Sequence, residues 1–399
     1  MTALGGNALA VAALALPALY AASSFVSLLR SMRAVPHLAP APAPRAAAPR
    51  LSVIVPACNE AETLEAALAS KLGSRYPNLE IVVVDDRSTD DTGAILDRLA
   101  ARDPRIVAVH VRELPPGWLG KLHAMHRGLE VATGELILFS DADVRFEPDL
   151  LGRAVRTLED EGLDFLTLVP DVRPSGFAVD AALTTMLRLL LTSGRLWRVR
   201  DPRSKVAVGA GLFNLVRKDA LTRSPGIEWL KLEVADDVAF GQMMKASGAR
   251  CGVFLGRDQV SLAFYDSVPA FVRGLEKNSY AVTGFRPAIA LPAQLVIAYL
   301  ELFPALAALA FAATGREAAA LVGVAVTLTP AVGQAILARW VGRPLASALV
   351  PLVGPALMLF ASARSIALVH ARGGITWRGI FYDLATLRRE TRLNRSFFD

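Results

Sequence analysis

The chain has 399 residues, of which 53% are hydrophobic, and its mean hydropathy is +0.40, which exceeds that of an ordinary soluble protein. The formal net charge is +6; in so apolar a chain this indicates an anionic membrane surface or a phosphate-bearing substrate rather than nucleic acid. The only two cysteines, Cys58 and Cys251, exclude a disulfide framework and a cysteine-rich zinc site.

The N-terminal segment is apolar and long enough to cross a bilayer. Residues 1–29 contain no Asp, Glu, Lys or Arg, and Arg30 and Arg33 follow them. A span needs roughly 20 apolar residues, and a cleaved signal peptide would begin with positive charge and be shorter. We therefore expect a retained anchor over 1–33. The Ala/Pro-rich stretch 34–50 predicts a semi-rigid linker.

Between about 51 and 285 the charge content is ordinary, and apolar strands alternate with helical patterns. Strands are expected near 51–60, where Pro56 would stop the strand, and near 79–86, 105–111 and 136–140, with helical spacing between them. This alternation predicts an α/β fold, a doubly wound and mostly parallel sheet with helices on both faces. Ligands of such sheets bind at the carboxyl ends of the strands.

Carboxylates stand where these strands end. A single acidic pair is explained by a turn or a helix cap, but two pairs on one rim beside further polar residues favour a ligand site. Gathered carboxylates would repel one another unless a cation joined them, and Mg²⁺ or Mn²⁺ shared with a substrate diphosphate fits that need. No Gly-Lys-Ser/Thr phosphate loop is present. The residues concerned are Asn59 and Glu60, Asp85 and Asp86, and Asp141 and Asp143.

At this point the sequence resembles a known family. The motifs SVIVPACNE, VVVDDRSTDDT, GWLGKLHAMHRG, FSDADV and VADDVAFGQMMKASG follow one another in the order and spacing of family-two glycosyltransferases with the GT-A fold. The resemblance covers about 51–285. The flanking apolar helices are similar to those of the membrane-bound branch that includes ceramide glucosyltransferases and bacterial hopanoid- and carotenoid-associated enzymes.

The resemblance implies a role for each matched position. Asp237 would be the general base, with Asp236 beside it in the catalytic pair as the cap of the helix. Asp143 would bind the metal directly, and Asp141 would complete the metal and substrate site. The donor would be a UDP-sugar, although the residues do not choose between uracil and another base. Its pocket would be formed by Pro56, Ala57, Asn59, Glu60, Asp85, Asp86 and Lys121.

The chemistry of sugar transfer requires two separate groups of carboxylates, one to hold a cation and one to act as a base. Sugar transfer expels a diphosphate, whose growing negative charge a bound cation stabilises. The attacking hydroxyl must lose a proton, which a positioned carboxylate can accept. Small residues at Gly209 and Gly211 would let the sugar approach the backbone closely; a bend in a glycine-containing strand is the alternative.

One departure from the family pattern is plain. Many processive relatives carry Gln-x-x-Arg-Trp after the base, and here the corresponding region reads FVRGLEKNSY. Arg273 or Lys277 would then supply positive charge for the diphosphate, unless both are interfacial residues beside a membrane. The missing motif argues against a polysaccharide synthase and for a single transfer.

Three apolar runs, 289–313, 318–338 and 345–369, predict transmembrane helices over 286–370, followed by a basic tail over 371–399. Gln294 and Glu301 lie inside the first run and indicate a contact with another helix or a polar wall for an acceptor hydroxyl. Arginines flanking the spans place the domain in the cytoplasm, but three C-terminal crossings would put the arginine-rich tail outside. The arginine-bearing segment 181–203 predicts an interfacial helix or a surface helix packed on the sheet.

We therefore expect a multi-pass inner-membrane glycosyltransferase that faces the cytoplasm and transfers one sugar, with inversion, to a lipid hydroxyl. The alternatives are a polyprenyl-phosphate sugar transferase, a polysaccharide synthase, and, from another class, a nucleotide-binding transporter or scaffold without catalysis. A base such as Asp237 argues against the last, because binding alone needs no base.

Overall fold

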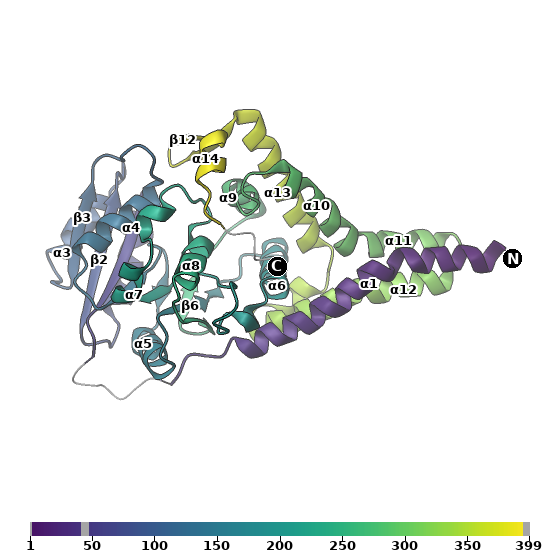
Figure 1. Ribbon diagram of the computed structural model, residues 1–399, viewed down its shortest axis with the longest axis horizontal. Coiled ribbons are helices and arrows are strands. Elements are labelled where there is room, and N and C mark those ends of the chain that lie inside the picture. The colour runs from purple at the N-terminus through teal and green to yellow at the C-terminus, as the bar shows by residue number, and fades with distance from the viewer. Residues whose placement is uncertain (1, 41–47, 394–399) are drawn as a thin grey trace.

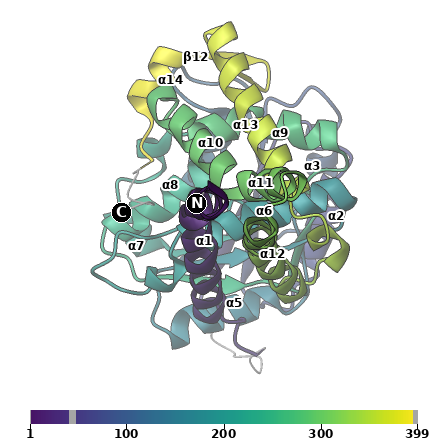
Figure 2. The ribbon, with the colours of Figure 1, turned by 90° about the vertical axis from the view of Figure 1, so that its right-hand side faces the viewer.

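A domain built on a β-sheet carries an arm of long apolar helices (Figure 1). The computed structural model describes residues 2–40 and 48–393. The arm contains α1 (Thr2–Ala34), α11 (Phe303–Ala313) and α12 (Glu317–Trp340), while α10 (Pro287–Glu301) and α13 (Val353–Arg372) slant from it toward the domain. Seen along the arm, α1, α11 and α12 lie beside one another in front of the domain (Figure 2).

The main sheet has seven strands in the order β3-β2-β1-β4-β8-β6-β9. Only β8 runs antiparallel to its neighbours, so the sheet is mostly parallel, as predicted. The strands are β1 (Leu51–Ala57), β2 (Leu79–Asp86), β3 (Ile106–Val111), β4 (Leu136–Phe139), β6 (Phe165–Val169), β8 (Asn214–Arg217) and β9 (Cys251–Leu255).

Helices cover both faces of this sheet, which confirms the doubly wound prediction. On one face the core joins strand residues such as Val53 to α2 (Leu64–Leu72), α3 (Thr92–Ala100) and α5 (Leu150–Asp160). On the other face it joins residues such as Ile54 to α4 (Gly120–Val131) and α8 (Asp236–Ala246). Alternate residues of one strand thus enter two cores, which is why the strands are apolar throughout.

The smaller elements complete the domain. A three-stranded sheet consists of β5 (Arg145–Phe146), β10 (Val260–Leu262) and β7 (Asp171–Val172). The remaining helices are α6 (Phe177–Ser193), α7 (Lys218–Arg223), α9 (Val268–Ala281) and three short 3₁₀ turns, Leu196–Arg198, Ile227–Leu230 and Leu345–Ala348.

Pro56 does not stop the first strand, contrary to the expectation from sequence. β1 continues to Ala57 and pairs with β2 along its whole length, whereas β4 pairs only with residues 51–54. The backbone N–H that proline lacks would therefore point beyond the end of β4, where no ladder bond is lost. The register explains why a central strand tolerates this proline.

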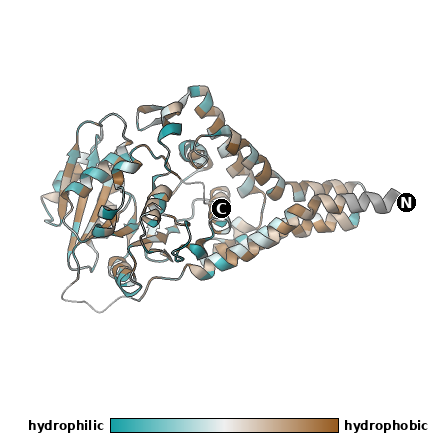
Figure 3. Ribbon diagram, viewed as in Figure 1, coloured by the Kyte–Doolittle hydropathy of each residue, from teal (hydrophilic) through white to brown (hydrophobic). Residues whose placement is uncertain are grey.

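Among the residues that the structure describes, three helices, Ala10–Ala34, α12 and α13, are long and apolar enough to cross a membrane, or four if the pair α10 and α11 counts as one span. The run expected at 289–313 is bent by 47° between α10 and α11. These helices are predominantly hydrophobic along their length (Figure 3). Their number and composition indicate association with a membrane.

The break between α10 and α11 lies beside a buried polar contact. Glu301, the last residue of α10, forms an ion pair of 2.6 Å with Arg188 of α6 and accepts a hydrogen bond of 2.8 Å from Tyr20 of α1. The structure thus favours the interpretation of Glu301 as a contact between helices. The segment 181–203 is not a surface helix packed on the sheet, because α6 packs on α1, α12 and α13; its place in a membrane interface stays a prediction.

The segment beyond residue 371 is folded rather than a simple basic tail. Strands β11 (Gly374–Trp377) and β12 (Ile380–Asp383) form an antiparallel hairpin, and α14 (Leu384–Glu390) follows it. Glu233 of the domain accepts hydrogen bonds from the backbone of Arg392 and Leu393 and so seats the end of this segment. In the linker expected at 34–50, Val35 and Leu38 are buried against the domain; residues 41–47 lie outside the described residues.

Candidate active site

One ammonium group joins carboxylates from two elements at the carboxyl edge of the sheet. Lys121, at the start of α4, lies with its Nζ 3.0 Å from Oδ1 of Asp141 and 3.2 Å from Oδ2 of Asp236. Asp141 follows β4, and Asp236 begins α8. Burial alone would lower the pKa of Lys121, but Asp141, Asp236 and Asp237 outweigh burial and raise it above its ordinary value. Lys121 is therefore a permanent cation here.

Asp237 lies beside this ion pair in the first turn of α8. Its Oδ2 accepts a hydrogen bond of 3.4 Å from the backbone N–H of Gly211. Burial, and then the charge of Asp236, raise the pKa of Asp237 to about 6. A carboxylate with this pKa is ionised at neutral pH and is a stronger base than an ordinary aspartate, as proton abstraction requires. The N-cap position of α8 is occupied by Ala235, so the expectation that Asp236 caps the helix is wrong.

The two glycines expected to admit the sugar have different surroundings. A Cβ on Gly211 would lie 3.0 Å from Nζ of Lys121 and 3.2 Å from Oδ2 of Asp141, inside the polar cluster. A Cβ on Gly209 would instead lie 2.2 Å from the backbone oxygen of Asp237. Gly211 thus borders the site. Gly209 instead lets the start of α8 pack closely against the backbone of residue 209 itself. A small cavity between these elements is lined by Pro56, Lys121, Asp141, Gly211, Asn214, Asp236, Asp237 and neighbouring apolar side chains.

The residues expected to hold a metal fit an ion that the substrate also ligates. Burial, and then the neighbouring charge of Asp141, raise the pKa of Asp143, a repulsion that a cation would relieve. Among the described residues, no three His, Cys, Asp or Glu side chains converge as a complete metal site. Two carboxylates completed by phosphate oxygens and water are the donor set typical of Mg²⁺ in nucleotide sites.

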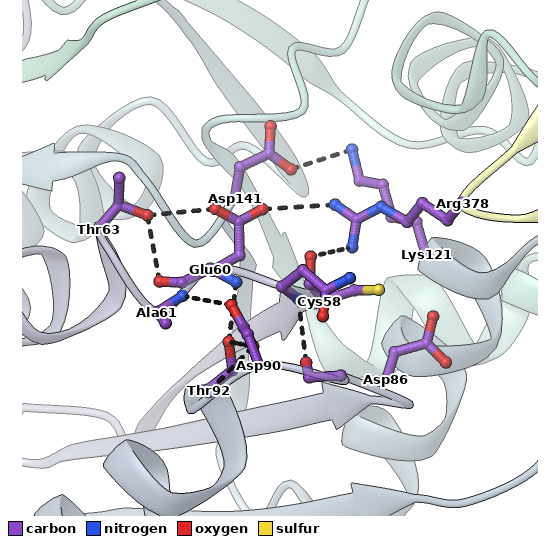
Figure 4. A network of polar contacts seen from close by, with 12 residues as sticks. Cys58, Glu60, Ala61, Thr63, Asp86, Asp90, Thr92, Lys121, Asp141 and Arg378 are labelled. Carbon is purple, nitrogen blue, oxygen red and sulfur yellow. Dashed lines mark hydrogen bonds and ion pairs between the residues drawn. The ribbon is translucent and has the colours of Figure 1, made fainter.

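The loops after β1 and β2 are tied together, which fixes the expected nucleotide pocket (Figure 4). The backbone N–H of Glu60 donates to Thr92 Oγ1 at 2.8 Å, and Asn59 Oδ1 accepts from the backbone of Thr89 at 2.8 Å. Asn59 has a φ of 57°, a backbone conformation that asparagine tolerates better than most residues. Pro56 and Ala57 form the end of β1 below these loops.

Asp85 and Asp86 end β2 and are buried. Asp85 Oδ2 lies 3.1 Å from Nδ1 of His110, and Asp86 forms an ion pair of 2.8 Å with Arg87. Both carboxylates therefore lie at the expected edge of the sheet, each with a neighbouring partner.

Of the two cations expected to replace the missing motif, the structure brings one to the site. The side chain of Lys277 lies over the ring of Trp377, 3.4 Å from its centroid. Burial, and then the charge of Lys121, lower the pKa of Lys277 to about 8. Arg273 lies one turn earlier in α9 and is exposed.

Sequence reasoning missed a further cation, Arg378, at the tip of the β11–β12 hairpin. Its Nη1 donates to the backbone oxygen of Cys58 at 2.9 Å, and its Nη2 lies 3.4 Å from Oε1 of Glu60. The available signal was Gly379 between two short segments rich in β-branched and aromatic residues, which indicates a turn between strands.

Comparison with known proteins shows what part of the domain is similar to. Residues 52–223 match the model of the family described as Glycosyl transferase family 2. The GalNAc(5)-diNAcBac-PP-undecaprenol beta-1,3-glucosyltransferase of Campylobacter jejuni is 37% identical over 110 residues, which are 28% of this chain and 33% of that protein. The Escherichia coli UDP-Glc:alpha-D-GlcNAc-diphosphoundecaprenol beta-1,3-glucosyltransferase WfaP is 30% identical over 115 residues, which are 29% of this chain and 43% of that protein. The chain thus spans less than half of the length of either relative.

Among solved structures, the mannosyltransferase PcManGT of Pyrobaculum calidifontis, in complex with GDP-Man and Mn²⁺, superposes with a TM-score of 0.55. The match covers 90% of this chain and 97% of that one at 24% sequence identity, so it bears on the fold alone. Residues 52–223 of the chain are thus similar to glycosyl transferase family 2, and the fold is of the GT-A type.

Proposed function

We propose that this protein is a membrane-bound glycosyltransferase that moves one sugar from a nucleotide sugar to a hydroxyl of a lipid or lipid-linked acceptor, with inversion at the sugar carbon. The observation that carries the proposal is the convergence of Asp141 from the end of β4 and Asp236 and Asp237 from the start of α8 around Lys121. Donor and acceptor groups would meet at this point.

In the proposed reaction, Asp237 accepts the proton of the attacking hydroxyl. The hydroxyl oxygen forms a bond to the anomeric carbon, and the bond from that carbon to the diphosphate oxygen breaks. The electron pair leaves with the nucleoside diphosphate. Lys121 keeps Asp141 and Asp236 in place and adds positive charge beside the leaving group.

Asp143 and Asp141 would hold a divalent cation together with the diphosphate. When bound, Mg²⁺ or Mn²⁺ supplies positive charge that stabilises the departing diphosphate. Mn²⁺ and GDP-Man in the complex of PcManGT support both the cation and the class of donor. We expect uridine as the base of the donor.

Two acceptor classes follow from different observations. The arm of apolar helices favours a membrane lipid with a free hydroxyl, as in the ceramide and hopanoid branch. The names of the two curated relatives favour a sugar hydroxyl on a polyprenyl diphosphate. Both acceptors bring a hydroxyl to Asp237 from the membrane surface, and they differ in the group that anchors it.

The decisive experiment uses full-length protein in detergent with Mn²⁺. UDP- and GDP-sugars are offered with either a membrane lipid extract or synthetic polyprenyl-diphosphate-linked sugars, and the lipids are analysed by mass spectrometry. We expect one hexose to be added to one acceptor class. Nucleotide-sugar binding without transfer to either class would favour the transporter or scaffold alternative.

The contacts of the C-terminal helices support one membrane topology. Arg257 of the domain donates to the carbonyls of Arg339 and Trp340 at the end of α12, and Arg378 beyond α13 donates to Cys58. Both ends of α13 therefore lie on the side of the catalytic domain. We propose that the bent pair α10–α11 and α12 cross the bilayer and that α13 lies at its surface.

This topology also satisfies the positive-inside rule, because the arginines after α1, those after α12 and those of the C-terminal segment all share the cytoplasmic side. Cysteines introduced by Arg316→Cys, between α11 and α12, and by Arg389→Cys test it in intact cells. A membrane-impermeant thiol reagent should label the first and not the second, with Glu113→Cys in the catalytic domain as the unlabelled control. Labelling of Arg389→Cys from outside would show that α13 spans.

A further inference from the structure

We infer that Arg378, carried by the hairpin that follows the last apolar helix, binds the diphosphate of the donor and supplies the positive charge that the missing Gln-x-x-Arg-Trp motif would provide. The inference rests on the proposed function and adds to it a residue from outside the family-matched segment. It makes the β11–β12 hairpin a part of the active site.

The position of Arg378 is the first reason. Its guanidinium lies at the end of β1, with Nη1 2.9 Å from the oxygen of Cys58 and Nη2 3.4 Å from Oε1 of Glu60. Figure 4 shows Arg378 and Lys121 directed toward the same group of carboxylates, which includes Glu60 and Asp141. Carboxyl ends of parallel strands are where nucleotide phosphates bind in such sheets.

The backbone of the hairpin tip is the second reason. Arg378 and Gly379 are the two residues between β11 and β12, and their φ angles are 48° and 80°. A turn with two positive φ values favours Asn-Gly or Gly-Gly, and an arginine there is strained. Strained residues persist where the surrounding structure holds them and cluster at binding sites. A turn chosen for stability alone would carry asparagine at this position.

Contacts on several sides hold the hairpin over the site. Trp377 stacks under Lys277 of α9, and the hydroxyl of Tyr382 donates to the carbonyl of Trp118 at 3.1 Å. Trp118 precedes α4, which carries Lys121. The hairpin is thus fixed to the elements that position the cations of the site, and its tip can present a guanidinium with little loss of freedom on binding.

The charges of the site are the third reason. Lys277 lies within electrostatic range of Lys121, Arg378, Asp236 and Asp141, so three cations surround one acidic cluster. Arginine matches phosphate oxygens with two parallel N–H groups, and a diphosphate carries such oxygens on both of its phosphorus atoms. Glu60 and the carbonyl of Cys58 position this guanidinium beside the acidic cluster.

The test compares Arg378→Asn with Arg389→Gln, which removes an exposed arginine of the same segment that hydrogen-bonds Glu390 and Thr386 within α14. Affinities of the full-length protein for UDP, GDP and the corresponding monophosphates are measured by calorimetry with Mn²⁺, beside the thermal unfolding midpoint. We expect Arg378→Asn to weaken binding of the diphosphate by about tenfold to a hundredfold, the range of a charged hydrogen bond. The monophosphate should lose less.

Because asparagine suits the turn, the unfolding midpoint of Arg378→Asn should equal or exceed that of the native protein, and Arg378→Lys should restore part of the affinity. A lower midpoint with unchanged diphosphate affinity would make Arg378 a structural residue and overturn the inference. If the native protein binds no nucleoside diphosphate, the proposed function itself fails. Native-like binding by Arg378→Asn would refute only the role of the hairpin.

Discussion

Replacement of Asp237 by asparagine should slow the reaction and stabilise the fold at the same time. The substitution keeps the size of the side chain and its place beside the N–H of Gly211 but removes the base. General-base assistance contributes about 10²–10⁴-fold in rate, so we expect a loss of that size in kcat. Donor affinity should change little, because Asp237 is proposed to contact the acceptor.

The gain in stability follows from the same pKa. Burial and Asp236 raise the pKa of Asp237 from 3.8 to about 6, so the folded state binds this proton more tightly than the unfolded state. Ionisation therefore destabilises the fold as pH rises from about 4 to 6. The shift corresponds to on the order of 3 kcal/mol for a fully buried group and to less for Asp237, whose side chain is partly exposed. Above pH 6 Asp237→Asn lacks this penalty.

The assay measures the transfer rate and the thermal unfolding midpoint of the same preparations between pH 5 and 8. Native kcat should fall as pH drops through about 6, because protonated Asp237 cannot accept a proton; the residual rate of the variant should lack this step. Asp219→Asn, which breaks an exposed ion pair with Arg223 on α7, is the control and should match the native protein in rate. A variant that melts earlier and loses donor affinity would show that Asp237 binds the donor and is not the general base.

Three further substitutions test other parts of the structure. Asp143→Ala should abolish Mn²⁺-dependent transfer and leave the unfolding midpoint unchanged or higher; full activity of this variant in EDTA would contradict the metal site. Gly209→Ala should lower both stability and activity, because its Cβ would lie 2.2 Å from the backbone oxygen of Asp237, and a native midpoint would show that α8 can shift. Glu301→Gln leaves Arg188 buried without its 2.6 Å partner and should destabilise the protein by about 3–5 kcal/mol, seen as a lower midpoint in detergent; an unchanged midpoint would show that the pair contributes nothing.

The sheet could be predicted because its first four strands are short apolar runs separated by helical patterns. The end of the first strand could not be placed, because the tolerance of Pro56 depends on β4 stopping at Phe139, a property of the neighbour. The bend between α10 and α11 was also missed. The available signal was Pro304 in the first turn of α11, because a proline inside an apolar helical run ends or kinks the helix just before it; the contacts of Glu301 with Tyr20 and Arg188 then lie at the break.

The candidate site could be predicted in part because the topology of a parallel sheet brings strand ends together. Since β4 lies beside β1, Asp141 is carried toward the loops after β1 although about 80 residues separate them in the sequence. The spacing of the motifs is therefore informative even without coordinates. Two features of the site depend on three-dimensional geometry that the sequence pattern does not contain. They are the identity of the residues that pair with Lys121 and the place of Ala235, rather than Asp236, at the cap position of α8.

Arg378 shows the limit of such reasoning. It is separated from Glu60 by 318 residues and by all the C-terminal apolar helices, and no strand periodicity links the two. Its approach to the site requires that α13 return to the catalytic side, so the membrane topology and the composition of the active site are one question. If α13 crossed the bilayer, the hairpin could not touch Cys58, and the acidic cluster would lack one of its three cations. Labelling of Arg389→Cys tests this arrangement through the side of the membrane on which the C-terminal segment lies. Diphosphate binding by Arg378→Asn tests the same arrangement through the composition of the active site.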